Sequence, residues 1–286
     1  MNINDIPNLD AVDEYIKKDE SEIVSMSEAV KQMEAKMGGR DVYPIGFRAF
    51  DDVMTGGIGE GDLVVISGPS GQGKTTFAQT ITWHLNKIGI PQLWFSYEVQ
   101  ITEIWQKFKA MGIDEDFMSF CPLKIESGNI DWIEKKITEG LLKYKTKVVF
   151  IDHLGFLNPK INEKNAKEFE RNFSAYLGQL VRQLKSIAIE KNIIIILLAH
   201  TRKTKEELGM DDIAHSIGIA QESDFVFMIE RQREKPKSSW DKSEGDVYTK
   251  YSKISLVKNR RTGINKFIKC VFSKGKLMEE TDEIFI

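Results

Sequence analysis

The segment GPSGQGKTT, residues 68–76, constrains this chain more than any other part of its sequence. It directly follows the apolar run Leu63 to Ile66 and precedes residues 77–85, where apolar side chains recur at helical spacing. A phosphate-binding loop requires a strand before it, a helix after it and the spacing G-x-x-x-x-G-K-T. That spacing is met by Gly68, Gly73, Lys74 and Thr75. We therefore expect a mostly parallel α/β sheet that holds nucleotide phosphates at a strand end.

The residue types of this segment suit a triphosphate. Glycines let backbone N–H groups and a helix N-terminus converge on the β-phosphate, where an additional Cβ would collide. Lys74 can reach the β- and γ-oxygens, and the Thr75 hydroxyl is the expected ligand of Mg²⁺. A glycine-rich turn that only joins a strand to a helix would not need Lys-Thr at this offset. The expected ligands are ATP and Mg²⁺, and the residues expected to contact the nucleotide are Gly68, Pro69, Ser70, Gly71, Gln72, Gly73, Lys74, Thr75 and Thr76.

Length and composition favour one large α/β domain with an appendage. The chain has 286 residues, of which 41% are hydrophobic. Its two cysteines and four scattered histidines do not suit a disulfide framework or a four-ligand zinc site, which favours a reducing compartment. The first residues lack an apolar signal segment, and no run of about 18 apolar residues occurs. We expect a cytoplasmic protein that is neither exported nor inserted in a membrane.

The first 40 residues are interpreted as a separate element. They hold nine acidic and five basic side chains, a net charge of −4, whereas the rest of the chain carries a net charge of +1. Apolar residues recur there at helical spacing up to Gly38-Gly39. We expect a helical N-terminal arm and linker at residues 1–40 and one ATPase domain at residues 41–286. A partly disordered acidic tail is the alternative for the arm.

From residue 41 onward, short apolar runs alternate with helical patterns, which is typical of a parallel sheet with crossover helices. The runs span residues 63–66, 93–96, 148–151 and 193–198, and the helical patterns span residues 77–88, 101–111, 129–143 and 169–188. The run at 193–198 is apolar enough for a strand covered on both faces. An antiparallel C-terminal extension of the sheet is predicted from strand patterns at residues 225–230, 247–257 and 265–272.

Two carboxylates follow predicted strands in the order that ATP hydrolysis requires. Asp152 ends the strand at 148–151, where a carboxylate can hold a Mg²⁺-bound water beside the phosphates. Glu98 follows the strand at 93–96 and can polarise the attacking water. An ordinary solvated glutamate is the alternative for Glu98.

Three further residues are candidates for phosphate chemistry. His200 follows the buried strand at 193–198, at the edge where ligands of such sheets bind, and can hydrogen-bond the γ-phosphate or be structural. Lys258 and Arg260 lie in VKNRRTG, at a predicted strand end and turn. An arginine supplied by a neighbouring subunit can stabilise charge on a transferring phosphoryl group. A solvated hairpin tip explains these cations equally well.

Taken together, these segments resemble the RecA-like motor domain of the DnaB-type replicative helicases. The matching segments are PIG at 44–46, TGGI at 55–58, the phosphate-binding loop, SYE at 96–98, IDHL at 151–154, AHTR at 199–202 and KNR at 258–260. The resemblance implies a RecA-like P-loop NTPase fold and a homo-hexameric ring that draws single-stranded DNA through its pore. It also implies Glu98 as catalytic base and His200 near the γ-phosphate. Lys258 and Arg260 would be cations given in trans.

The sequence also departs from the pattern of that family. The position of His200 is often glutamine in bacterial members, and His-Thr-Arg is more similar to the mitochondrial Twinkle branch. His153 stands where a tyrosine is usual. Bacterial members carry a globular N-terminal domain that receives primase, whereas only the acidic arm precedes the motor in this sequence. A helicase loader or primase is a candidate partner.

The resemblance assigns the loops after the strands that end in Asp152 and His200 to the pore. Basic side chains there can follow phosphates without reading bases, and six copies would multiply a modest charge. Each loop also carries acidic residues, so a solvated loop is the alternative. The residues expected to contact single-stranded DNA are Lys160, Lys164, Arg202, Lys203 and Lys205.

Three functions are compatible with these residues. The first is an ATP-driven ring motor on single-stranded DNA, a DNA helicase, which the single phosphate loop and the Lys-Asn-Arg turn favour. The second is a regulatory ATPase similar to KaiC, in which the nucleotide controls assembly or a partner and nothing is translocated. The third is a recombinase-like filament protein.

Overall fold

The computed structural model describes residues 24–37, 40–113, 116–126, 130–157, 166–201, 216–234 and 247–280. The chain divides into two compact units, residues 1–41 and 42–286. In the first unit, helix α2 (Met26–Met37) follows Ser25, whose hydroxyl accepts a hydrogen bond from the Glu28 N–H, a typical N-terminal cap. Residues 1–23 of the expected arm lie outside the described residues.

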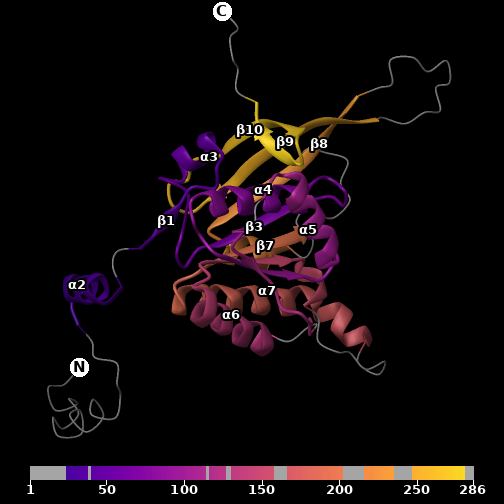
Figure 1. Ribbon diagram of the computed structural model, residues 1–286. Helices are drawn as coiled ribbons and strands as arrows, with labels where there is room; N and C mark the ends of the chain where they lie inside the picture. Colours follow the sequence, from indigo (N-terminus) through magenta and orange to yellow (C-terminus); the bar gives the residue numbers. More distant parts are fainter. Residues whose placement is uncertain are drawn as a thin grey trace, which may run out of the picture. The chain divides into compact units, whose positions relative to one another are not determined.

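The second unit is built on a nine-stranded sheet with the order β11-β10-β9-β8-β3-β7-β6-β4-β5. Figure 1 labels β10, β9, β8, β3 and β7 of this sheet. Every pairing from β5 to β8 is parallel, and those from β8 to β11 are antiparallel. The antiparallel extension therefore begins at β9, one strand later than expected from the pattern, because β8 pairs in parallel with β3. The strands are β3 (Leu63–Gly68), β4 (Gln92–Ser96), β5 (Ser119–Phe120), β6 (Val148–Asp152), β7 (Ile194–His200), β8 (Phe225–Glu234), β9 (Val247–Asn259), β10 (Lys266–Ser273) and β11 (Lys276–Glu279).

Helices follow the parallel strands as crossover connections. They are α4 (Lys74–Lys87), α5 (Ile101–Ala110), α6 (Ile130–Tyr144), the 3₁₀ turn η2 (Leu154–Phe156), α7 (Ala166–Glu190) and α8 (Ser216–Glu222). A short helix α3 (Arg48–Val53) and a two-stranded antiparallel sheet of β1 (Val42–Tyr43) and β2 (Ile58–Gly59) precede β3. None of the described helices combines the length and the apolar character needed to cross a membrane.

The two faces of the sheet bury two separate apolar clusters. In β3, Val64 and Ile66 face the cluster shared with α4 and α5, whereas Leu63 and Val65 face the cluster shared with α6 and α7. This alternation follows from the two-residue period of a strand. Because both faces are covered, the central strands are apolar throughout, as the run at 193–198 predicts, and their polar functional groups stand at the strand ends.

Candidate functional site

The parallel strands bring their carboxyl ends to one edge of the sheet, and the predicted catalytic residues gather there. Gly68 at the end of β3 is in register with His200 at the end of β7, and Ser96 at the end of β4 is in register with Asp152 at the end of β6. Glu98 follows Ser96 by two residues. Polar side chains far apart in the sequence thus share one crevice, as expected for an open α/β sheet.

The loop between β3 and α4 has a backbone that glycine alone adopts readily. Gly73 caps α4 with a left-handed backbone at φ 100°. At Gly68, an added Cβ would lie 2.4 Å from the carbonyl oxygen of Ile229 on the neighbouring strand β8. The two glycines are therefore required for the turn and for its close approach to the sheet. The loop leads directly into the N-terminus of α4, where N–H groups favour an anion.

Lys74 is the buried cation of the site, with a side chain directed back across the loop. Its Nζ donates to the carbonyl oxygens of Gly68 and Pro69, each at 2.9 Å, and lies 3.1 Å from Nδ1 of His200. Burial lowers the pKa of Lys74, an effect opposed by the carboxylates of Glu98 and Asp152. The ammonium is thus held beside the loop by acceptors that a phosphate oxygen can replace.

Thr75 and Asp152 form the candidate magnesium site. The Thr75 hydroxyl donates to Oδ2 of Asp152 at 2.9 Å. Burial raises the pKa of the Asp152 carboxyl to about 6, against the lowering effect of the Thr75 hydrogen bond. A hydroxyl and a carboxylate are hard oxygen ligands of the kind that Mg²⁺ prefers, and a cation there would favour the charged carboxylate. The two residues therefore fit the ion predicted from the sequence.

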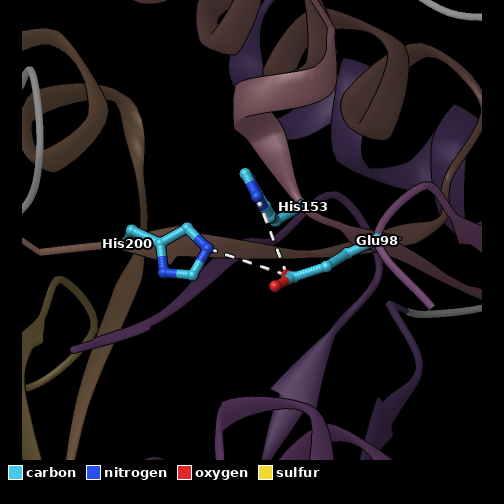
Figure 2. Close-up of side chains that lie close together, drawn as sticks. All are labelled: Glu98, His153 and His200. Atoms are coloured by element: carbon cyan, nitrogen blue, oxygen red, sulfur yellow. Dashed lines mark ion pairs between the residues drawn. The ribbon is translucent and has the colours of Figure 1, made fainter. Parts of the chain in front are cut away.

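The Glu98 carboxylate faces two histidines, His153 and His200, whose ring centres are 4.3 Å apart (Figure 2). Its Oε2 lies 3.7 Å from Nε2 of His153 and 3.6 Å from Nε2 of His200. Burial lowers the pKa of His153 to about 4, and the neighbouring His200 contributes to this lowering. Burial, followed by the Lys74 charge, also lowers the pKa of His200. Both imidazoles are therefore neutral at physiological pH.

The structure does not bring Lys258 and Arg260 to the phosphate loop of the same chain. The Arg260 N–H donates to the Asp224 carbonyl at 2.9 Å, and the Asp224 N–H donates to the Leu63 carbonyl at 2.8 Å. These contacts attach the turn to the first residue of β3, whereas the phosphate loop follows the last, about 17 Å along the strand. The Arg260 side chain is 57% exposed and lies 3.5 Å from an Asp224 carboxylate oxygen.

The other two cations of this turn are engaged within the chain. Lys258 Nζ donates to the carbonyl oxygens of Gln221 at 3.1 Å and Ser223 at 2.7 Å. Arg261, to which the sequence pattern gave no role, donates to the Gly57 carbonyl and pairs with the Asp62 carboxylate, both at 2.9 Å. Arg261 is thus a structural arginine that joins the turn to the segment before β3.

A cavity of about 350 Å³ opens beside the loop and extends onto β8 and β9. Gln72 spans it, because its Nε2 donates to Tyr248 Oη and its Oε1 accepts from the Arg231 N–H, both at 2.9 Å. The Arg231 guanidinium lies 5.0 Å from the centre of the Tyr248 ring. Sequence patterns missed Arg231 and Tyr248 because only the pairing of β8 with β9 brings them to the loop.

The five residues predicted to contact DNA lie outside the described residues. They belong to segments 158–165 and 202–215, which follow the strands that end in Asp152 and His200. They are Lys160, Lys164, Arg202, Lys203 and Lys205. Their role stays a prediction.

Comparison with known proteins gives two groups of relatives. The family model of the KaiC ATPases matches residues 43–221. Replicative DNA helicases DnaB of Haemophilus influenzae and Mycoplasma pneumoniae are 26% and 25% identical over 229 and 265 residues, which cover 68% and 80% of this chain but 48% and 53% of theirs. The chain thus spans about half the length of these relatives. A UPF0273 protein of Pyrococcus furiosus is 30% identical over 188 residues, 60% of this chain and 73% of its own.

Two solved structures share the fold. A DnaB-like replicative helicase, described with its interactions with primase, has a TM-score of 0.65 at 19% identity and is matched over 97% of this chain and 73% of its own. A second structure, of an ATPase domain, has a TM-score of 0.67 at 18% identity, over 90% of this chain and 99% of its own. The RecA-like α/β fold expected from the sequence is confirmed.

Proposed function

Because this chain belongs to the KaiC family of ATPases, we propose that it hydrolyses ATP as the motor of a DnaB-type DNA helicase. In this proposal the chain assembles as a homo-hexameric ring, and hydrolysis at each subunit interface moves single-stranded DNA through the pore and unwinds duplex. The similarity to the DnaB relatives, although low in identity, supports an ATPase domain of this type. Movement along DNA is the step that the proposal adds. A helicase loader or primase would be the partner of such a ring.

The observation that supports this proposal is the distance, within one chain, between the phosphate loop and the exposed Arg260. Lys74, Glu98 and Asp152 lie at one end of the parallel sheet, and Arg260 is exposed at the other. Its guanidinium cannot reach the loop of its own chain, but a neighbouring copy can present it there. An arginine that arrives from a second subunit makes hydrolysis conditional on assembly. Such conditional hydrolysis is what a ring motor requires.

Within one protomer, each residue has a separate role in hydrolysis. The amide groups of the loop bind the phosphates, and Lys74 exchanges its carbonyl partners for the β- and γ-oxygens. Thr75 and Asp152 would hold Mg²⁺, which neutralises the charge that develops on the phosphate oxygens. Glu98 accepts a hydrogen bond from the attacking water and takes its proton. When Lys74 leaves Nδ1 of His200 for the phosphates, His200 would carry its proton on Nδ1 and hydrogen-bond the γ-phosphate.

The cavity beside the loop suits the base and ribose of the nucleotide. The loop fixes the phosphates, and the cavity lies on the side of the loop formed by Gln72 and Thr76. The centre of the Tyr248 ring lies 5.0 Å from the Arg231 guanidinium and 4.8 Å from that of Arg233, and a base would stack on this ring by displacing one of them. Purine and pyrimidine nucleotides would both stack there, so the preference for ATP is part of the proposal.

A regulatory ATPase similar to KaiC is the second candidate. It is favoured by the UPF0273 relative, of which this chain covers 73%, a larger share than of the DnaB relatives. Both functions use the same phosphate loop, magnesium site and general base. They differ in what hydrolysis moves.

One pair of measurements separates the two candidates. ATP turnover should increase on addition of single-stranded DNA if the chain is a motor, and should be indifferent to DNA if it is a regulatory ATPase. A forked duplex with a fluorescent strand should then be unwound in the presence of ATP and Mg²⁺. Turnover without DNA stimulation or strand displacement would exclude the helicase and leave the regulatory ATPase.

A further inference from the structure

His153 lies against the Glu98 carboxylate, and the roles proposed above make no use of it (Figure 2). Its side chain is only 14% exposed, and its Nε2 is 3.7 Å from Oε2 of Glu98. On the other side of the ring, Nδ1 accepts a hydrogen bond from the Gly155 N–H at 2.9 Å. The imidazole is thus placed between a backbone donor and the carboxylate of the proposed base.

These contacts fix where the proton of each imidazole lies. A ring nitrogen that accepts an N–H bond carries no proton, so the proton of neutral His153 is on Nε2, facing Glu98. His200 has the same arrangement, because its Nδ1 is 3.1 Å from the Lys74 ammonium, which can only donate. Two N–H groups therefore face one oxygen of the Glu98 carboxylate.

The same three side chains have the spacing of a metal site, but their hydrogen bonds oppose one. The ligand atoms of Glu98, His153 and His200 lie within 4.8 Å of one another. A histidine that binds a metal through Nε2 carries its proton on Nδ1 and donates it to an acceptor. Here both Nδ1 atoms face donors, so a metal would have to displace the Gly155 and Lys74 contacts. The arrangement suits a carboxylate held by two donors.

We propose that His153 is a positioning residue for Glu98, which it orients through its Nε2–H. This inference rests on the proposed hydrolysis of ATP. The separation of 3.7 Å exceeds a hydrogen bond, and such contacts commonly shorten when the substrate binds. A donor on one oxygen fixes the orientation of the carboxylate and leaves its other oxygen to the water. Since Glu98 acts on the water rather than on the nucleotide, His153 affects kcat and leaves the nucleotide affinity unchanged.

Gly155 is part of this arrangement. An added Cβ at this position would lie 2.6 Å from Cε1 of the His153 ring, although the φ angle of Gly155 is not in the region reserved for glycine. A methyl group there would push the imidazole away without straining the backbone. Gly155→Ala therefore moves the Nε2 donor without removing it.

Two substitutions of His153 separate the proposed role from a purely local one. His153→Asn keeps an acceptor near the Nδ1 position for the Gly155 N–H but has no donor near the Nε2 position. His153→Gln supplies an N–H₂ group near the Nε2 position. We expect kcat for ATP to fall about 10- to 100-fold in His153→Asn and Gly155→Ala, with unchanged nucleotide affinity, and to recover largely in His153→Gln. If His153 only shaped the turn by accepting the Gly155 hydrogen bond, His153→Asn would be more active than His153→Gln.

The measurements are steady-state ATP turnover, binding of a fluorescent ATP analogue, and thermal unfolding of each variant. In a Glu98→Gln background, His153→Asn should change the residual rate less than about twofold, because the group that it orients is gone. Equal kcat in wild type and His153→Asn would overturn the positioning role alone. A wild-type chain that does not hydrolyse ATP would instead overturn the proposed function and this inference with it.

Discussion

The Nζ of Lys74 lies 3.1 Å from Nδ1 of His200 and also donates hydrogen bonds to two carbonyl oxygens of the phosphate loop. All three partners accept hydrogen bonds, so the ammonium is held beside the place where a γ-phosphate would enter. ATP binding is expected to transfer Lys74 from these acceptors to phosphate oxygens. Lys74 and His200 therefore connect the phosphate loop to Glu98, the proposed general base.

Lys74→Ala should abolish ATP turnover, because it removes the ammonium that the Gly68 and Pro69 carbonyls hold against the loop. Phosphate release is the measurement. Lys87→Ala is a matched control on the same helix, since Lys87 is exposed at its far end, and should keep wild-type activity. Turnover that survives in Lys74→Ala would contradict the assignment of the site.

Arg260→Ala subunits should bind ATP normally but hydrolyse it slower by about 10³-fold or more, because the arginine acts on the neighbouring site. Mixing them with Lys74→Ala subunits should restore part of the activity, since those subunits supply an intact Arg260 to an intact loop. The double variant Lys74→Ala/Arg260→Ala is the control and should restore nothing. Absence of rescue in mixed assemblies would argue against the role in trans.

Tyr248→Ala should raise KM for ATP about tenfold with little change in kcat, because base stacking contributes to affinity rather than to bond breaking. Tyr248→Phe, which keeps the ring and loses the hydroxyl bonded to Gln72, should have a smaller effect. Phe267→Ala, an exposed aromatic residue outside the cavity, is the control. An unchanged KM in Tyr248→Ala would remove the base from this cavity.

Arg261→Ala should lower the free energy of unfolding by about 2 to 4 kcal/mol, because it leaves the buried Asp62 carboxylate without its cation. Urea denaturation measures the change. Arg48→Ala is the matched control: its ion pair with Asp52 is 3.9 Å long with side chains 92% and 71% exposed, and its loss should be close to neutral. Equal stability of the two variants would contradict the structural role of Arg261.

The two cysteines should differ in reactivity. Cys121 is exposed, whereas Cys270 is buried and its pKa is raised by that burial to about 12. A thiol reagent at about pH 8 should modify one cysteine in the native chain and two after unfolding. The unfolded state loses the Cys270 proton near pH 9 and the native state only near pH 12, so stability should fall as pH rises between these values. Cys270→Ala should reduce this fall, to which the buried Tyr97 hydroxyl also contributes because burial raises its pKa; rapid native labelling of Cys270 would contradict its burial.

The sequence alone predicted most of one edge of the sheet. Lys74 and Thr75 follow from the spacing of a loop motif, and Asp152 and His200 from their place directly after apolar runs. Parallel strands end at a common edge, so the order of motifs along the chain was sufficient to predict that these groups meet. Glu98 was predicted in the same way.

The remaining parts depend on pairings that no local pattern encodes. Tyr248 reaches Gln72 because β9 pairs with β8 in a register that shifts twice along its length. Arg261 looked like its neighbours in the cluster of cations, but its partner Asp62 lies 199 residues away in sequence. The hydrogen bond from Gly155 that orients His153 depends on a turn of only three residues, too short for a periodic signal.

The attachment of the Arg260 turn to Leu63 and Asp62 gives strand β3 a second task. This strand begins beside the attached turn and ends at the loop that would bind the phosphates. In a closed ring, each β3 would rigidly connect two consecutive ATP sites. A small tilt of one subunit would withdraw its Arg260 from the neighbouring site and at the same time reorient its own phosphate loop. The order in which successive sites hydrolyse ATP would then be set by rigid geometry, without a flexible segment between the sites.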